Sequence, residues 1–213
     1  MKKSYLPIIP VLIFLITGCP SAGPDNPSWT DPFANANSEA VTQLLAADID
    51  SEIPYPAYYG IQEVEIFPGL TITEYELRYY IYTTAFTSVD ITFERESDTL
   101  VNATLVYSGI NTSWSAYWIF NAIEDGDSGY INMTDITIEL SADLAETGTT
   151  LNSISVFFSD FSSDIPSGIE DTAFHLGTDI FDLTEDILLA AFKDISAEII
   201  PEILDLYKSE ILD

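Results

Sequence analysis

The feature that most constrains the fold is the C-terminal stretch 178–213. On a helical wheel at about 100° per residue its apolar side chains fall within one wide arc. Thr178 or Asp179 can cap the start, and Pro201, which lacks an amide proton, predicts a kink or a restart. Roughly 30 helical residues at about 1.5 Å each reach on the order of 45 Å. Such a face needs a matching apolar surface, and it comprises Ile180, Phe181, Ile187, Leu188, Ala191, Phe192, Ile195 and Ile199.

The segments before this helix have the alternating pattern of strands. Short polar connections, such as 96–98 and 125–129, predict turns and therefore an antiparallel meander. The stretch 38–50 predicts a short helix, and 162–178 has no clear period and is expected to be a loop. Helices at the two ends predict an α+β fold, in which a long coiled antiparallel sheet wraps around the long C-terminal helix. The predicted strands are 61–67, 70–84, 87–95, 100–107, 114–123, 131–140 and 151–158.

The N-terminus has the pattern of a leader. Two lysines precede an apolar stretch, 5–16, that is too short to span a bilayer comfortably. The sequence Leu-Ile-Thr-Gly-Cys that ends at Cys19 resembles the lipobox of bacterial lipoproteins. That resemblance implies that Cys19 becomes the first residue and carries lipid, palmitate included, on its sulfur and amine. The alternative is an ordinary secretory leader cut near Cys19, or a short anchor.

These patterns divide the chain into three parts. Residues 1–18 are predicted to be a signal peptide, 19–37 a lipidated cysteine with a flexible tether, and 38–213 one domain. The protein is then expected outside the cytoplasm, anchored through its N-terminal lipid to a bacterial membrane, on the periplasmic face or the cell surface. Cys19 is the only cysteine, so no disulfide forms within the chain.

The charge is strongly negative. The chain has 35 acidic and 6 basic residues, a formal net charge of −29. Such a surface repels nucleic acid phosphates and anionic lipid headgroups, so no nucleic acid partner is expected. It would favour cations or a basic protein partner. Adaptation to a salty medium or simple solubility explains it better, because the acids are spread along the chain rather than clustered.

Three segments resemble a known family. The strand pair 127–144, the strand 151–159 and the helical sequence 199–204 are similar to the lipid-binding barrels of bactericidal/permeability-increasing and lipopolysaccharide-binding proteins. These belong to the tubular lipid-binding (TULIP) superfamily, and the resemblance covers roughly residues 38–212. It implies a coiled sheet around a long helix, with lipid acyl chains in the tunnel between them. The tip loops of that family are often basic, to meet lipid A phosphates, whereas the loops here are acidic. This departure counts against endotoxin and leaves a neutral or zwitterionic lipid, held by its tails, as the expected ligand.

A lipid carrier needs apolar surface beyond what packs against itself. Burying an acyl chain gains about 0.8 kcal/mol per methylene, so such a site needs no catalytic group. The alternative for the same residues is a plain packed core. The candidate lining residues are Leu44, Leu45, Ile49, Val89, Ile91, Phe93, Ile136, Ile138, Ile154, Val156, Ile187, Leu188, Ala191 and Ile195.

Polar chemistry is poorly supported. The acidic stretch 124–129 lacks the closing Glu of a calcium loop and is better explained as a turn. His175 is the only histidine, and no serine has nucleophile-elbow sequence around it. Neither an enzyme nor a cofactor is expected. The predicted function is binding or transfer of an amphipathic lipid by a membrane-anchored protein. The alternatives are a structural or adhesive surface lipoprotein with a packed core, and a carboxylate-based hydrolase; a protein partner stays open.

Overall fold

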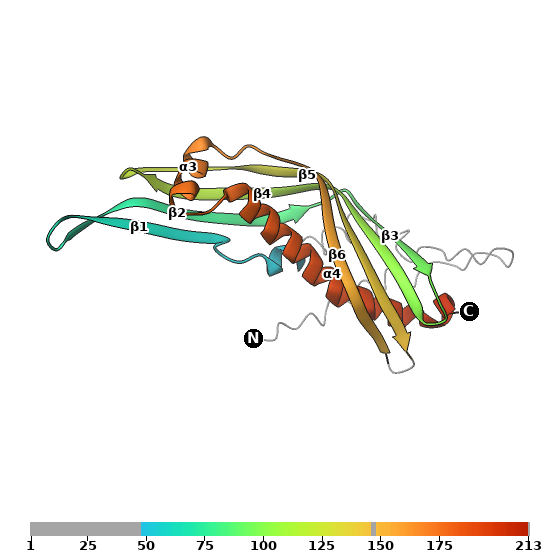
Figure 1. Ribbon diagram of the computed structural model, residues 1–213. Helices are drawn as coiled ribbons and strands as arrows, with labels where there is room; N and C mark the ends of the chain where they lie inside the picture. The colour runs from blue at the N-terminus through green and yellow to red at the C-terminus, as the bar shows by residue number, and fades with distance from the viewer. Residues whose placement is uncertain (1–47, 146–147, 213) are drawn as a thin grey trace.

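The computed structural model describes residues 48–145 and 148–212, and it is built on one long antiparallel sheet (Figure 1). The predicted leader, Cys19, the tether, Leu44 and Leu45 lie outside the described residues. Of the predicted N-terminal helix, the described part is the turn 48–52. The other elements are β1 (Tyr58–Phe67), β2 (Leu70–Ala85), β3 (Ser88–Arg95), β4 (Leu100–Phe120), β5 (Ile123–Ala145), β6 (Gly148–Ser163), α3 (Ser167–His175) and α4 (Ile180–Leu212).

The sheet is a meander in which two strands, β2 and β3, lie end to end beside β4. Its order is β1-β2-β4-β5-β6, every pair is antiparallel, and β3 pairs with β4. β2 pairs with the second half of β4 and β3 with the first half, in a register that continues from Ala85↔Asn111 to Ser88↔Ser108. β2 and β3 are therefore one interrupted strand and not a hairpin.

A bend crosses the whole sheet where that interruption lies. Thr87, Gly109, Thr134 and Asp160 lie at the same level of neighbouring strands, as the register of the flanking pairs shows. Gly109 has φ 64° and Asp160 has φ 53°, and a side chain on Gly109 would collide with Thr87. At this level the buried side chains of β4 and β5, and the half-buried ones of β6, change from one parity to the other, so the same face of the sheet stays apolar beyond the bend.

A change in which positions are buried, from odd-numbered to even-numbered residues, explains why strands such as β4 are longer than predicted. In β4 the buried positions are odd from Val101 to Tyr107 and even from Ile110 to Trp118. The loss of phase resembles the end of a strand, so the sequence predicted two segments where there is one. The predicted turn at 125–129 is wrong for a related reason, because it lies inside β5. The chain reverses instead at Asn121-Ala122, with φ of 50° and 60°, between the paired residues Phe120 and Ile123.

The predicted loop 162–178 is also wrong, because it contains α3 as well as the last residues of β6. Ile169, Thr172 and Ala173 are buried at helical spacing, and α3 packs on β2 and β4. The Thr172 hydroxyl donates a hydrogen bond of 2.6 Å to the Gly168 carbonyl within this helix. α3 has nine residues, too few for a helical period to stand out in the sequence.

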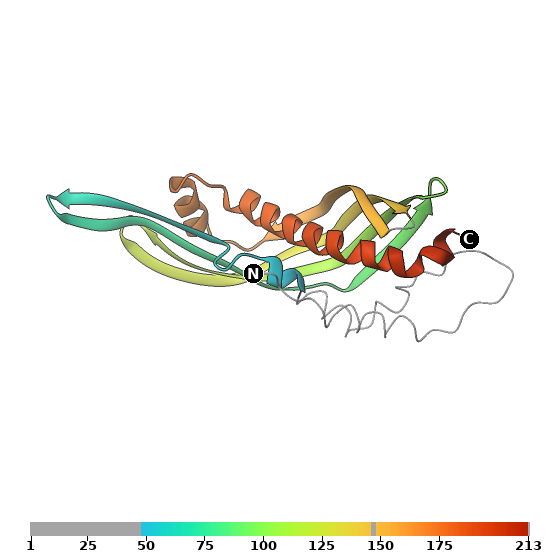
Figure 2. The same cartoon turned by 90° about the horizontal axis from the view of Figure 1, so that it is seen from below.

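The sheet curls into a half-barrel, and α4 lies along its concave side (Figures 1 and 2). This confirms the predicted α+β class and the wrapping of the sheet around the C-terminal helix. The helix has 33 residues and continues through Pro201. Ile200 and Leu204, on either side of the proline, are both buried in the core cluster, so the helix stays packed on both sides of Pro201. Of the helices within 48–145 and 148–212, none has the length and apolar character needed to cross a bilayer.

Candidate functional site

The candidate site is the apolar interior between the sheet and α4. One cluster joins the core residues of β2 to β5 with Leu188, Phe192 and Ile195 of α4. The Tyr107 ring lies 4.9 Å from the Phe192 ring, edge to face. Among the predicted lining residues, those that are buried are Ile49, Val89, Ile91, Ile136, Ile138, Leu188, Ala191 and Ile195, and those that are half-buried are Phe93, Ile154, Val156 and Ile187.

This interior approaches solvent along one side, where the edge strand β6 meets α4. On β5 the inward side chains are fully covered, whereas their partners on β6, Ile154, Val156 and Phe158, are half-buried. Phe181 and Ile187 of α4 are half-buried as well. We call these five residues the β6–α4 seam. It brings together predicted lining residues from the sheet and from the helix.

Two pairs of hydroxyls in the interior are hydrogen-bonded. The hydroxyl of Thr184 lies 3.2 Å from that of Tyr79 and 2.6 Å from the Ile180 carbonyl oxygen. Tyr107 and Ser196 are hydrogen-bonded at 3.3 Å. Burial raises the pKa of Tyr79 and of Tyr107 to about 12, so both side chains stay neutral near pH 7. The interior therefore offers apolar contact and paired hydroxyls, which suits an acyl chain.

The β1–β2 hairpin extends the sheet beyond the helices, at the far left of Figure 1. Several of its apolar side chains are exposed, as is Ile123 at the start of β5. Glu63, Glu65 and Glu74 accompany them. Exposed apolar clusters of this kind are typical of contact surfaces. The exposed residues are Ile61, Val64, Ile66, Phe67, Leu70 and Ile72.

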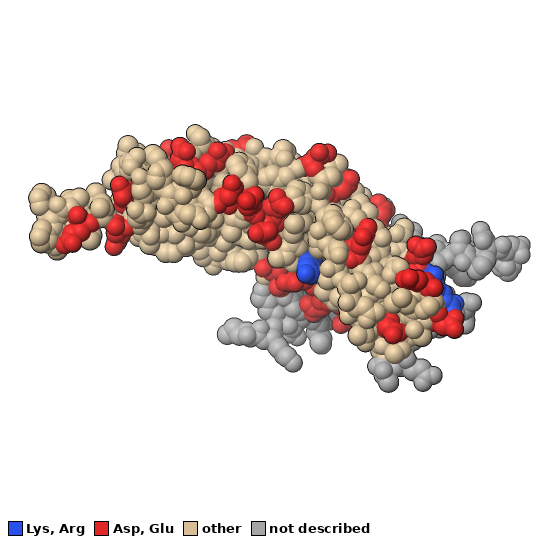
Figure 3. All heavy atoms as spheres, viewed as in Figure 1, with Lys and Arg blue, Asp and Glu red and all other residues tan. Residues whose placement is uncertain are grey.

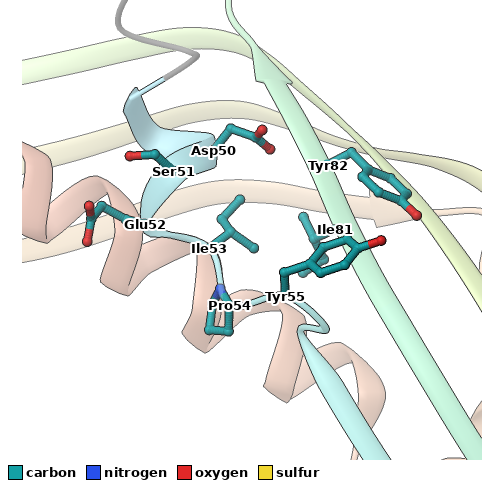
Figure 4. A pocket seen from close by; sticks show the side chains of 8 residues that line it. All are labelled: Asp50, Ser51, Glu52, Ile53, Pro54, Tyr55, Ile81 and Tyr82. Carbon is teal, nitrogen blue, oxygen red and sulfur yellow. The ribbon is translucent and has the colours of Figure 1, made fainter. Parts of the chain in front are cut away.

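Two pockets lie outside this interior. One, of about 580 Å³, follows the bend and is lined by residues of β4, β5 and β6, including Asp135 and Asp160. The other, of about 530 Å³, lies between the segment 50–55 and β2 (Figure 4). Its lining includes Asp50, Tyr55 and Tyr82, none of which was singled out from the sequence. Their positions 50, 55 and 82 have no common spacing, so only the fold brings them together.

Asp48, in the turn 48–52 beside this second pocket, lies in surroundings that disfavour its charged form. Burial, and then the carboxylates of Glu198 and Glu52, raise the pKa of Asp48 to about 6. Glu198 belongs to α4, so the turn 48–52 packs against the helix with like charges facing each other. Figure 3 shows acidic side chains spread over the visible face, with few bases among them.

The other polar residues considered from the sequence, His175 and the stretch 124–129, are part of the packing and of the sheet. The His175 ring stacks on Tyr75 at 4.6 Å, and its Nδ1 lies 2.7 Å from the Asp171 carbonyl oxygen. Within the described residues no group of three or more His, Cys, Asp or Glu side chains is placed to hold a metal ion. The acidic stretch 124–129 is extended strand.

Comparisons with known proteins find similar chains among the solved structures. No family model matches the chain, and no curated protein matches its sequence. A solved structure described as the crystal structure of lipopolysaccharide binding protein is similar, with a TM-score of 0.48 and 11% sequence identity. The similarity covers 80% of this chain and 39% of that chain. The present chain thus spans about two-fifths of the protein it is similar to.

Proposed function

We propose that this protein binds an amphipathic lipid, with the acyl chains between the sheet and α4 and the headgroup at the β6–α4 seam. The observation that carries the proposal is the change in burial across the sheet. The inward face is fully covered on β5 and half-exposed on β6, beside half-exposed apolar residues of the helix. A small separation of α4 from β6 would give an acyl chain access to a continuous apolar surface.

We also propose where the protein acts and that it does not convert its lipid. Lipidation at Cys19 would hold the domain at the outer side of a bacterial membrane, and the chain would carry or hand over one lipid without converting it. The exposed apolar end of the β1–β2 hairpin supports contact with a lipid surface, and its glutamates favour zwitterionic over anionic headgroups.

Native mass spectrometry tests this directly. The chain from residue 20 onward is secreted behind a standard leader, purified without detergent from a membrane-containing host, and extracted for lipid. We expect a stoichiometric lipid, which Val156→Glu in the seam removes by placing a charge where the acyl chain lies. The matched control is Phe157→Glu, because the adjacent side chain points to the outer face and is 53% exposed. Circular dichroism checks that both variants fold.

The second candidate is a structural or adhesive surface protein with a packed core. The complete burial of Ile136, Ile138 and Leu188 favours it, since these side chains already fill space that a tunnel would need. A protein that stays free of lipid after incubation with mixed liposomes would overturn the lipid-binding proposal and leave this candidate.

A further inference from the structure

Tyr55 and Tyr82 line the pocket beside β2. Together with Tyr80, whose ring contacts both of theirs, they form what we call the tyrosine wall. The Tyr55 ring lies 5.1 Å from the Tyr80 ring and 6.5 Å from the Tyr82 ring, and Tyr80 and Tyr82 stack at 6.2 Å with planes 10° apart. The hydroxyls of Tyr82 and Ser115 lie 3.0 Å apart, which fixes one ring on the strand. The pocket is thus bordered by ring surfaces that remain open to solvent, with Tyr55 76% exposed.

Another wall of the same pocket is acidic. Figure 4 shows the carboxylate of Asp50 on the same side as the Tyr55 and Tyr82 rings, while Glu52 points the other way. Burial raises the pKa of Asp50. The ion pairs that the structure gives for the described residues are Arg78–Glu76 and Arg95–Asp98, and neither includes Asp50.

The base on this part of β2 is engaged elsewhere. Arg78 precedes Tyr80 by two positions, donates from Nε to Glu76 at 2.6 Å, and lies over the rings of Tyr59 and Tyr117 at 5.7 and 5.5 Å. Those contacts pair its charge and direct the guanidinium to other aromatic side chains. Arg78 therefore does not cover the rings of Tyr55 and Tyr82, which stay available to a cation from solution.

Open aromatic faces beside a carboxylate, in a pocket of about 530 Å³, have a particular chemistry. Ring faces carry a negative quadrupole and attract cations that are weakly hydrated, above all quaternary ammonium groups. An anion would be repelled by Asp50, and a small metal ion would find few oxygen ligands among rings. We propose that this pocket binds a quaternary or methylated ammonium group, held over Tyr55 and Tyr82 with its charge balanced by Asp50. This site is separate from the interior of the half-barrel, so it stands whether or not that interior holds a lipid.

Titration with tetramethylammonium tests the proposal on the whole chain. Binding is followed by the NMR signals of the tyrosine rings at constant ionic strength, with sodium replaced by tetramethylammonium, and choline is compared with its neutral isostere 3,3-dimethylbutan-1-ol. We expect saturable binding of both ammonium compounds and none of the neutral alcohol. Binding should weaken about fivefold or more in Tyr82→Leu, since an open cation–π contact contributes about 1 kcal/mol.

Matched variants separate this site from the general attraction of an acidic protein for cations. Asp50→Asn should weaken binding, whereas Tyr130→Leu, which removes an exposed ring on β5, and Asp90→Asn, which removes an acid on β3, should not. Thermal denaturation confirms that all four variants fold. Equal losses in all of them, or binding that potassium displaces as well as choline does, would overturn the proposal.

A second arm identifies the source of the ammonium group. Vesicles of a choline lipid and of an anionic glycerol lipid are sedimented with the protein, with and without tetramethylammonium. Co-sedimentation with choline vesicles that tetramethylammonium reverses assigns the pocket to a lipid headgroup. Binding of the free cation alone assigns it to a soluble ammonium compound. Binding of neither overturns the site.

Discussion

Replacing Asp48 by asparagine should stabilise the protein, and more so as the pH rises. Asp48 is 7% exposed, and its pKa is raised from 3.8 to about 6 by burial and then by Glu198 and Glu52. A folded-state pKa above the unfolded value means that the native state holds a proton that the unfolded state has released. The stability is therefore highest below the unfolded pKa and falls as the pH rises from about 4 through about 6.

The size of the effect follows from the shift. Each pKa unit corresponds to about 1.4 kcal/mol, so a shift of about two units costs up to about 3 kcal/mol once Asp48 is ionised. Solvent at the neighbouring pocket screens part of this, and asparagine brings its own polar group. We expect Asp48→Asn to raise the free energy of unfolding by about 1–2 kcal/mol near pH 7.5 and by close to zero near pH 4.

Urea denaturation followed by tryptophan fluorescence measures this at both pH values. Asp90→Asn on β3 is the control for the removal of one negative charge from a protein of net charge −29. A gain that is the same at low and high pH, or no larger than that of the control, would refute the reasoning, because it would mean that the carboxylate of Asp48 is not held in an unfavourable environment.

Four further predictions concern the fold. Ala122→Gly should raise the free energy of unfolding by about 0.5–1 kcal/mol, because Ala122 has φ 60° in the β4–β5 turn; thermal denaturation measures it. Tyr107→Phe should lower it by about 0.5–1.5 kcal/mol through loss of the hydrogen bond to Ser196, measured by urea denaturation. Asp164→Ala should cost about 1–3 kcal/mol in the same assay, because the buried indole of Trp114 donates to this carboxylate at 2.9 Å, and Asp164→Asn should recover part of it. Raising the salt from about 0.01 M to about 1 M should raise the melting temperature by screening the acidic surface, and an unchanged value would contradict self-repulsion as a destabilising factor.

The local patterns that the sequence carries predicted the elements that are long and regular. The apolar arc of 180–199 predicted α4 correctly, since one continuous helix buries one continuous face. The turn at Pro68-Gly69 and the alternation of 87–95 also appear in the structure as the β1–β2 turn and β3. The α+β class follows from the order of these elements alone. The acidic character, too, is complete in the sequence.

Only the tertiary structure decided where, along a strand, the alternation of buried and exposed side chains shifts by one residue. At the bend, Gly109 and Asp160 adopt positive φ, and the buried side chains move to the other parity. A period of two within one strand cannot distinguish this change from a strand end, because only the neighbouring strands keep the pairing continuous. The same holds for 125–129, where pairing with β4 outweighs turn composition. A side chain at position 129 would collide with the carboxylate of Asp164, which glycine avoids.

The sequence by itself determined that a long apolar helix must meet a long apolar sheet, because each buries a face that the other covers. It also determined the negative charge, and it predicted that apolar residues such as Ile138 and Leu188, which are buried in the structure, face the interior. Only the tertiary structure decided that this interior approaches solvent between β6 and α4, and that Asp50, Tyr55 and Tyr82 share a pocket. The physical reason is that periodicity describes which way a side chain faces within its own element. The partner that covers it, or leaves it open, belongs to another element and is set by how the sheet bends and curls.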